Sequence, residues 1–391
     1  MTVPKWIQLY KNRSLGADSG TETFPLKTND QICELLLTVR AKNGATANAP
    51  DAVAMPTIES SITGVQISSG AAIFKSYTGE INRKLATHRD GGLPRTMYTQ
   101  AAGGTYAGND DPALGWMSYD FPIRFNLKSD PYGNRSNVIF PAPLYAGVLD
   151  LTLDYNFTIS ATAGFLTGGA NHLFDLYALV KPPESQEAMQ QKRVLVERKR
   201  QNYTTTAEGD EPIKLTLSKD RFLRQLMVFC YENGIGEGID ITDMQLKVNG
   251  DVLQAGKWGN IQALNANHNN LNYYIDYYMK NVGATDELWT RIPAPIPMMF
   301  AGTSPTVAPF FTVLGTGDKV TVTTDAANDV NLMRIGSNVN PGVAVFDLDM
   351  DESLSNMQHC GVNDIELLLT NGGAGGSVEI IEQHIARPWQ G

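Results

Sequence analysis

The chain carries one motif twice: residues 62–85 read ITGVQISSGAAIFKSYTGEINRKL, and residues 241–264 read ITDMQLKVNGDVLQAGKWGNIQAL. The first matches are Ile62-Thr63 with Ile241-Thr242 and Val65-Gln66-Ile67 with Met244-Gln245-Leu246. A shift of one residue then aligns Gly70, Gly79 and Ile81 with Gly250, Gly259 and Ile261. The two copies begin about 180 residues apart in a chain of 391 residues, which predicts two similar domains in tandem.

The segments around this motif alternate between apolar and polar residues, which is the period of a β-strand with one buried face. The clearest case is Leu149–Ser160, LDLTLDYNFTIS, in which every odd-numbered residue is apolar. Shorter alternations occupy residues 121–127, 213–217 and 346–350. Continuous apolar runs, typical of strands buried on both faces, occupy Ile32–Val39, Leu226–Tyr231 and Ile365–Leu369. The pattern predicts an all-β fold whose turns use the 36 glycines and 20 prolines.

Two segments have the features of helices. Pro182–Arg200 begins with prolines and continues as EAMQQKRVLVERKR, and Trp258–Lys280 places apolar residues at spacings of three and four. Asparagines between 265 and 272 weaken the second helix, so a break near His268 is expected. Long loops rich in small and polar residues are expected at 43–60 and 99–115, and loops of that length are usually functional or mobile.

A β domain of about 180 residues with some eight strands fits a sandwich, and the jelly roll leaves few free sheet edges. The chain resembles the double jelly-roll major capsid proteins of tailless icosahedral viruses and bacteriophages. The length, the duplicated half, the helix after ITDMQLKVNG and the ending NDIELLLTNGGAGGSVEIIEQHIARP carry this resemblance. The expected organisation is an N-terminal arm at 1–29, a first jelly roll at 30–185, a linker at 186–209 and a second jelly roll at 210–391.

The resemblance implies a structural role in the virion after synthesis in the host cytoplasm, and no enzymatic activity. Two similar domains per chain imply a homotrimer with six roughly equivalent domains, a pseudo-hexagonal unit that tiles an icosahedral shell. The implied partners are neighbouring capsomers, minor or penton capsid proteins and, for part of this family, an internal lipid membrane. No cofactor is implied.

Composition excludes several other classes. Charged residues make up only 18% of the chain and the net charge is −10, which disfavours sequence-specific nucleic-acid binding because phosphate contacts require an excess of Lys and Arg. The three cysteines are far apart and predict neither a disulfide framework nor a zinc site. Residues 1–14 have no apolar core of a signal peptide, and no apolar run reaches 18 residues.

Few residues offer chemistry. Asp347, Asp349 and Asp351 in FDLDMDE are weak candidates for calcium ligands, but the positions where an EF-hand loop has Gly and its last Glu hold Glu352 and Gln358. A polar strand face explains the aspartates equally well. Neither GxSxG nor HExxH is present, so no catalytic residue is identified.

Two surfaces are candidates for assembly. The N-terminal segment offers Trp6, Ile7 and Tyr10 as apolar anchors against neighbouring copies. The basic segment supplies Lys192, Arg193, Arg198, Lys199 and Arg200, which are expected at the base of the shell, facing a lipid headgroup layer or packaged genome. A solvated helix with ordinary salt pairs is the competing interpretation of the basic segment.

Two other functions stay open at this stage. A two-domain β-sandwich can bind carbohydrate as an adhesin or lectin, in which case the long loops would hold the glycan. A jelly-roll hydrolase or lyase would require a groove with two carboxylates at catalytic spacing. The first alternative requires export and the second a pair of carboxylates that the sequence alone does not identify.

Overall fold

The computed structural model describes residues 3–42, 58–101, 116–145, 147–158, 165, 168–215, 221–232, 241–280, 285–289, 298–302, 310–313, 319–323, 330–337, 342–360 and 363–387. For 96–101, 116–117, 231–232 and the described residues from 273 to 337, only the backbone is described. Most of the two loops expected at 43–60 and 99–115 therefore lies outside the described residues.

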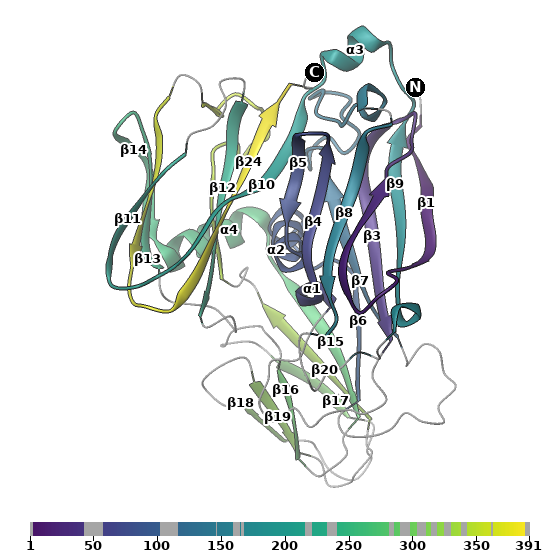
Figure 1. The fold of residues 1–391 in the computed structure, drawn as a ribbon. Coiled ribbons are helices and arrows are strands. Elements are labelled where there is room, and N and C mark those ends of the chain that lie inside the picture. The colour runs from purple at the N-terminus through teal and green to yellow at the C-terminus, as the bar shows by residue number, and fades with distance from the viewer. Residues whose placement is uncertain are drawn as a thin grey trace.

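The first half of the chain forms a β-sandwich (Figure 1). One sheet contains, in spatial order, β1 (Lys5–Ser14), β9 (His172–Lys181), β3 (Gln31–Lys42) and β7 (Trp116–Arg124). The facing sheet contains β2 (Ser19–Pro25), β8 (Leu149–Asn156), β4 (Ile62–Ser69) and β5 (Ala72–Tyr77). Two four-stranded antiparallel sheets of this strand order form a jelly roll.

The second half repeats this arrangement. One sheet contains β10 (Val194–Thr204), β24 (Gly376–Ala386), β12 (Arg221–Glu232) and β21 (Val343–Asp347), with β22 (Gln358–His359) also paired to β12. The facing sheet contains β11 (Gly209–Lys214), β23 (Ile365–Asn371), β13 (Ile241–Val248) and β14 (Asp251–Lys257). Each strand takes the position of its counterpart in the first sandwich, so the prediction of two tandem jelly rolls is confirmed.

Alternation in the sequence explains which faces form the cores. Along β8 and β9 every second side chain is buried, and the apolar positions of 149–157 point inward. The large side chains of the first sandwich form one cluster, which includes Phe121 and Phe174, whereas a separate cluster around Leu246 and Leu367 fills the second. Burial of these apolar surfaces supplies the main driving force for each half.

Further strands extend the molecule away from its termini. β6 (Thr96–Ala101) pairs with β7 and, in parallel, with β15 (Tyr273–Lys280), which continues through β20 (Val330–Ser337) to β17 (Met298–Gly302). A small sheet contains β16 (Thr285–Trp289), β19 (Lys319–Thr323) and β18 (Phe310–Val313). Figure 1 shows these strands at one end of the molecule and both termini at the opposite end.

The helices are short. They are α1 (Ile58–Ser61), α2 (Gly79–Asp90), α3 (Gln186–Gln190) and α4 (Trp258–Asn269), with 3-10 turns η1 (Ala142–Tyr145) and η2 (Gly169–Asn171). The predicted helix at 182–200 was wrong beyond Gln190, because residues from Val194 onward form strand β10, which pairs with β24 and β5. The helix at 258–280 ends at Asn269, close to the expected break, and β15 follows. Within the described chain, no helix combines the length and apolarity needed to span a bilayer.

The repeated motif maps onto the same elements in both halves, a β-hairpin followed by a helix. Val65 pairs with Tyr77 and Met244 with Gly256, and both hairpins have a register shift two residues later, after Ile67 and after Leu246. Corresponding residues of the two copies differ in number by the same amount all the way from the first hairpin strand to the start of the helix. The helix begins at Gly79 in α2 and at Trp258 in α4. The one-residue shift in the sequence alignment is therefore wrong: the counterpart of Gly70 is Asn249, and both have a left-handed φ, 55° and 54°.

The expected boundaries also change. Residues 1–29 contribute β1 and β2 to the first sandwich and do not form a separate arm. Residues 186–209 contain α3 and β10, the first strand of the second sandwich. The connection between the jelly rolls is therefore limited to the segment around α3.

Candidate functional site

The two sandwiches join through a continuous sheet. β5, at the edge of the first sandwich, pairs in parallel with β10 of the second, with Lys75 opposite Glu197 and Ser76 opposite Arg198. A nine-stranded sheet therefore runs through both halves. Because backbone hydrogen bonds fix the register of this contact, the two jelly rolls are held in one relative orientation.

A buried ion pair lies at the point where the strands meet. Lys75 Nζ is 2.8 Å from Glu197 Oε2, and the Lys75 side chain is fully buried. The ammonium group also lies 4.9 Å from the centre of the Phe125 ring, and Gln383 Nε2 donates to Glu197 Oε1 at 2.7 Å. Burial lowers the pKa of Lys75, while the charge of Glu197 opposes that shift. Each charge compensates the other where neither is exposed to water.

Arg224 connects several carboxylates and amides. It is the extra residue of a bulge in β12, between Leu223 and Gln225, and bulges often redirect a side chain. Its Nε donates to Asp349 Oδ2 at 3.1 Å, its Nη2 to Glu352 Oε1 at 3.0 Å, and its Nη1 to the Gln383 side-chain oxygen. All three nitrogens of a guanidinium that is only 5% exposed are therefore paired.

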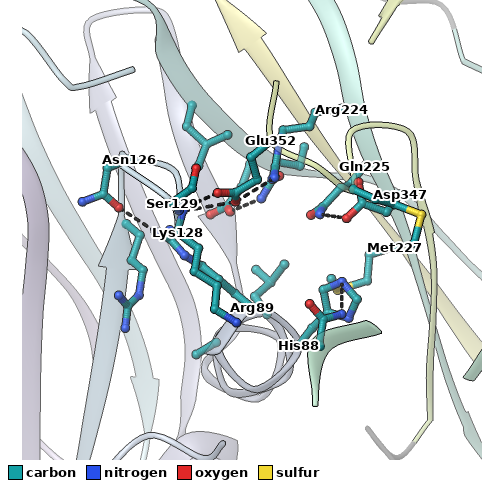
Figure 2. Close-up of a pocket in the computed structure, with 18 of the residues that line it drawn as sticks. His88, Arg89, Asn126, Lys128, Ser129, Arg224, Gln225, Met227, Asp347 and Glu352 are labelled. Atoms are coloured by element: carbon teal, nitrogen blue, oxygen red, sulfur yellow. Dashed lines mark hydrogen bonds and ion pairs between the residues drawn. The ribbon is translucent and has the colours of Figure 1, made fainter. Parts of the chain in front are cut away.

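Glu352 extends this network to the first sandwich. Its carboxylate accepts backbone N–H groups from Lys128 at 3.1 Å and from Ser129 at 2.6 Å, as Figure 2 shows. Burial tends to raise the pKa of Glu352, but these hydrogen bonds and Arg224 lower it overall. Glu352 has a φ of 53°, a left-handed conformation that is costly for a residue with a Cβ. The contacts hold the carboxylate in this position.

A pocket of about 360 Å³ lies between the sandwiches, beside α2 and α4. Its wall includes His88 and Arg89 from α2, Arg224 from β12, and Asp347 and Glu352 (Figure 2). Burial, with the charge of Arg224 and others, lowers the pKa of His88 to about 3, so this imidazole is neutral at physiological pH. Several charged groups of the wall are held in ion pairs: Arg224 with Glu352 inside the wall, and Arg124 and Glu197 with residues behind it. Paired charges favour a structural contact between the sandwiches over a reactive centre.

The three candidate aspartates do not converge. Asp349 is buried against Arg224, Asp347 accepts a hydrogen bond from Gln225 at 2.5 Å, and Asp351 accepts one from the backbone of Ser353 at 3.2 Å. Among the described residues, no group of three or more His, Cys, Asp or Glu side chains is placed to hold a metal ion. Asp347 and Asp349 instead contribute to the contacts between the two sandwiches.

The basic segment is largely neutralised by glutamates. Its ion pairs are Lys192 with Glu184 at 2.9 Å, Lys199 with Glu379 at 2.7 Å and Arg200 with Glu382 at 3.3 Å. From Val194 onward the segment lies on strand β10, where successive side chains point to opposite faces. For Lys192, Lys199 and Arg200, the interpretation as residues in ordinary salt pairs therefore holds.

The remaining two basic residues, Arg193 and Arg198, line a second pocket of about 950 Å³. Arg221 and Arg387 line it too, and none of the described residues of its wall is acidic. The pocket lies beside the β4–β5 turn, the end of α3 and the end of β24, at the end of the molecule where both termini lie (Figure 1).

The N-terminal anchors lie on β1, an edge strand. Tyr10 packs against Phe24 and Phe174 at ring distances of 5.6 and 6.0 Å and donates to the Pro25 carbonyl at 2.7 Å. Ile7 packs partly buried against the core, whereas Trp6 is 50% exposed. Of the three, Trp6 is the residue most available to a neighbour.

The sequence did not identify the residues that hold the two sandwiches together. Lys75 and Arg224 each stand as a single charge among apolar strand residues, and Glu197 begins a run of charges. Their partners are more than 100 positions away. A charged residue inside an apolar run was the available signal, as with Arg224 in RFLRQLMVFCYE. The signal shows that a charge is buried but does not identify its partner.

The comparisons with known proteins give structural likeness only. No protein-family model and no curated protein matches the sequence. The major capsid protein of Sulfolobus turreted icosahedral virus matches with a TM-score of 0.58 at 12% identity, covering 99% of this chain and 98% of that one. The major capsid protein P2 of bacteriophage PM2 matches with a TM-score of 0.53 at 8% identity, covering 99% and 98%.

VP54 of the virus PBCV-1 matches with a TM-score of 0.53 at 9% identity, covering 98% of this chain and 94% of that one. These structures are double jelly-roll capsid proteins. The chain thus has their fold over nearly its whole length, and the expected fold class is confirmed.

Proposed function

We propose that this chain is a major capsid protein, whose work is assembly into the shell of a virion and not catalysis. The observation that carries the proposal is the duplication: two jelly rolls with the same strand order, joined by a continuous sheet. The near-full-length likeness to capsid proteins of several viruses supports it. The proposed location is the virion.

The finer proposal is a homotrimer. Three chains supply six jelly rolls, and six similar bodies around one axis have a pseudo-hexagonal outline that fills a plane without gaps. Such a tile must keep its two halves in a fixed orientation. The buried pair of Lys75 and Glu197 and the contacts of Arg224 and Glu352 meet that requirement.

Light scattering of the purified chain tests this proposal. A trimer has a mass of about 130 kDa, three times the 42.7 kDa of the chain. We expect this species to dominate and to persist on dilution. A chain that stays monomeric at all concentrations would contradict the proposal.

We further propose that the end with both termini faces the particle interior. The strands β15–β20 lie at the opposite end and would point outward (Figure 1). The pocket lined by Arg193, Arg198, Arg221 and Arg387 would then face an internal membrane, where each basic residue near anionic headgroups contributes about 1 kcal/mol.

Vesicle co-sedimentation checks this orientation. The trimer should bind vesicles containing phosphatidylserine more strongly than neutral phosphatidylcholine vesicles, and Arg193→Gln with Arg198→Gln should reduce that binding. The matched control, Lys11→Gln with Arg13→Gln, removes the same charge from two exposed residues of β1 that do not line the pocket. It should leave binding unchanged. Equal binding to both vesicles, or stronger binding to double-stranded DNA, would contradict a membrane-facing role.

The carbohydrate-binding alternative is not favoured, because no feature of the described residues supports it over assembly. Its binding loops were expected at 43–60 and 99–115, which lie mostly outside the described residues.

A further inference from the structure

Two of the edge strands in the described part of the chain, β1 and β14, lie on opposite sides of the molecule. β1 ends the eight-stranded sheet of the first sandwich and β14 ends the four-stranded sheet of the second. Figure 1 shows them at the two lateral extremes of the molecule. An open edge exposes unpaired backbone N–H and C=O groups, which proteins usually cover or use for pairing.

These edges are the counterparts of the two strands that meet inside the chain. β14 corresponds to β5, because the two hairpins share their register and their register shift. β1 corresponds to β10, because β1 has a register shift after Gln8 against β9 and β10 has the same shift after Lys199 against β24. By this register, Trp6 takes the position of Glu197 and Gln254 that of Lys75.

The surfaces next to these edges differ in exposure between the halves. α2 buries eight of its 12 residues, whereas its counterpart α4, also of 12 residues, buries only Trp258 and Ile261. Phe74 on β5 is 5% exposed, but Leu253 at the same position of β14 is 45% exposed. The second sandwich thus leaves open a surface that is covered in the first.

The open surfaces are also apolar. Val252 is 55% exposed on β14, Leu264 is 67% exposed on α4, and Trp6 is 50% exposed on β1. Trp is among the residues that most often dominate the energy of an interface, especially when neighbouring groups exclude water from it. The two edges therefore have the composition of surfaces that pack together.

We propose that β14 of one chain pairs in parallel with β1 of a second copy, in the register that β5 and β10 use within the chain. This inference rests on the proposed capsid function and specifies the surfaces through which the copies associate. Gln254 lies opposite Trp6 of the second copy and Ala255 opposite its Ile7. An uncharged contact between Gln254 and Trp6 takes the place of the ion pair between Lys75 and Glu197.

The contact is head-to-tail, so it can either close into a ring or continue as a filament. Repeating the internal junction between chains gives a ring in which first and second sandwiches alternate. Such a ring closes after three chains when each junction turns the next sandwich by one sixth of a turn. The same pairing therefore explains why association would stop at a trimer.

A disulfide across the proposed junction tests the register. Paired positions of adjacent strands are about 4.8 Å apart, within the Cα separation that a disulfide allows. The full chain carrying both Ile7→Cys and Ala255→Cys is oxidised and run on a non-reducing gel. The native cysteines Cys33, Cys230 and Cys360 are buried, so they contribute little background.

The expected result is a covalent trimer from the double variant. Each single variant alone should remain uncross-linked, and a mixture of the two single variants should give covalent dimers only. A matched control pair, Ile7→Cys with Glu211→Cys on the opposite edge strand β11, should not cross-link. Trimers that form without cross-linking between positions 7 and 255 would overturn this pairing.

A second pair of variants tests the surface without cysteines. Val252→Asp on β14 places a charge in the proposed contact, and Val148→Asp places one at a valine that is also 55% exposed but lies before β8. We expect Val252→Asp to raise the concentration needed for half-association at least tenfold and Val148→Asp to leave it unchanged. Circular dichroism confirms that both variants are folded.

The outcomes separate the two proposals. Trimers that neither cross-link nor respond to Val252→Asp more than to Val148→Asp contradict the β14–β1 pairing and leave the capsid function standing. A wild-type chain that remains monomeric contradicts both.

Discussion

At the scale of single residues, the junction depends on charges that water does not reach. Lys75 is completely buried and Glu197 is 7% exposed. Removing a single partner from such a pair costs much more than replacing both, because the remaining charge stays buried without compensation. The ion pair therefore favours one arrangement of the two sandwiches over others that would separate its charges.

We predict that Lys75→Met lowers the free energy of unfolding by about 3–5 kcal/mol, since it leaves Glu197 unpaired. Lys75→Met with Glu197→Gln removes both charges and keeps an acceptor for Gln383, so it should recover most of that loss. Urea denaturation of the three proteins measures the difference. A cost below about 1 kcal/mol for the single variant would mean that water reaches the pair.

Buried histidines make the fold sensitive to acid. Burial, with nearby positive charges, lowers the pKa of His88 to about 3 and that of His384 well below its usual 6.5. Both are neutral when folded and take up a proton when unfolded, so stability falls as pH drops below about 6.5. Glu352, whose pKa is also lowered, adds to this loss only below its usual 4.5.

We predict that the free energy of unfolding decreases by up to about 2 kcal/mol per histidine between pH 7 and pH 5. His88→Gln should reduce this slope, because glutamine does not titrate, although it should also lower stability at pH 7. Denaturation midpoints at pH 7, 6 and 5 provide the measurement. An unchanged slope in the variant would show that His88 is not neutral in the folded chain.

At the scale of elements, the sequence was most informative where the alternation of apolar and polar residues alone predicts a strand. The alternation at 149–160 predicts β8 because one face of that strand meets the core. The helix prediction failed at 194–200, where the prolines at 182–183 and the sequence EAMQQKRVLVERKR suggested a helix but the segment forms a strand paired with β24 and β5. Strands that are distant in the sequence determine that this segment is a strand, and the local pattern of residues does not identify them.

The duplicated elements allow a matched test of the junction. Gly91 ends α2 with a φ of 75°, and Gly70 turns between β4 and β5 with a φ of 55°. A Cβ on Gly91 would lie 2.6 Å from the carbonyl oxygen of Asn269 in the second sandwich, but a Cβ on Gly70 would meet nothing within 4 Å. The two positions thus share their backbone conformation and differ in their surroundings.

We predict that Gly70→Ala costs about 1–2 kcal/mol, the usual penalty for a left-handed residue with a Cβ. Gly91→Ala should cost clearly more, because the backbone of α4 must also move away from α2. Thermal denaturation of both variants measures the difference. Equal costs would indicate that the contact between α2 and α4 contributes little to holding the halves together.

At the scale of the whole molecule, the sequence predicted the two jelly rolls but not the contacts that hold them together. The repeat identified two similar halves, since hairpin and helix recur with nearly the same residues. How the halves meet depends on Lys75, Arg224 and Glu352, whose partners lie in other elements. Those contacts hold the two halves in one arrangement, which the proposed role as a tile of a shell requires.

Electron cryomicroscopy of the purified oligomer can show the arrangement of the jelly rolls. We expect threefold particles with six lobes around the axis, in which first and second jelly rolls alternate and β14 of each chain lies beside β1 of the next. Particles of any other symmetry, or chains that never associate, would contradict this expectation.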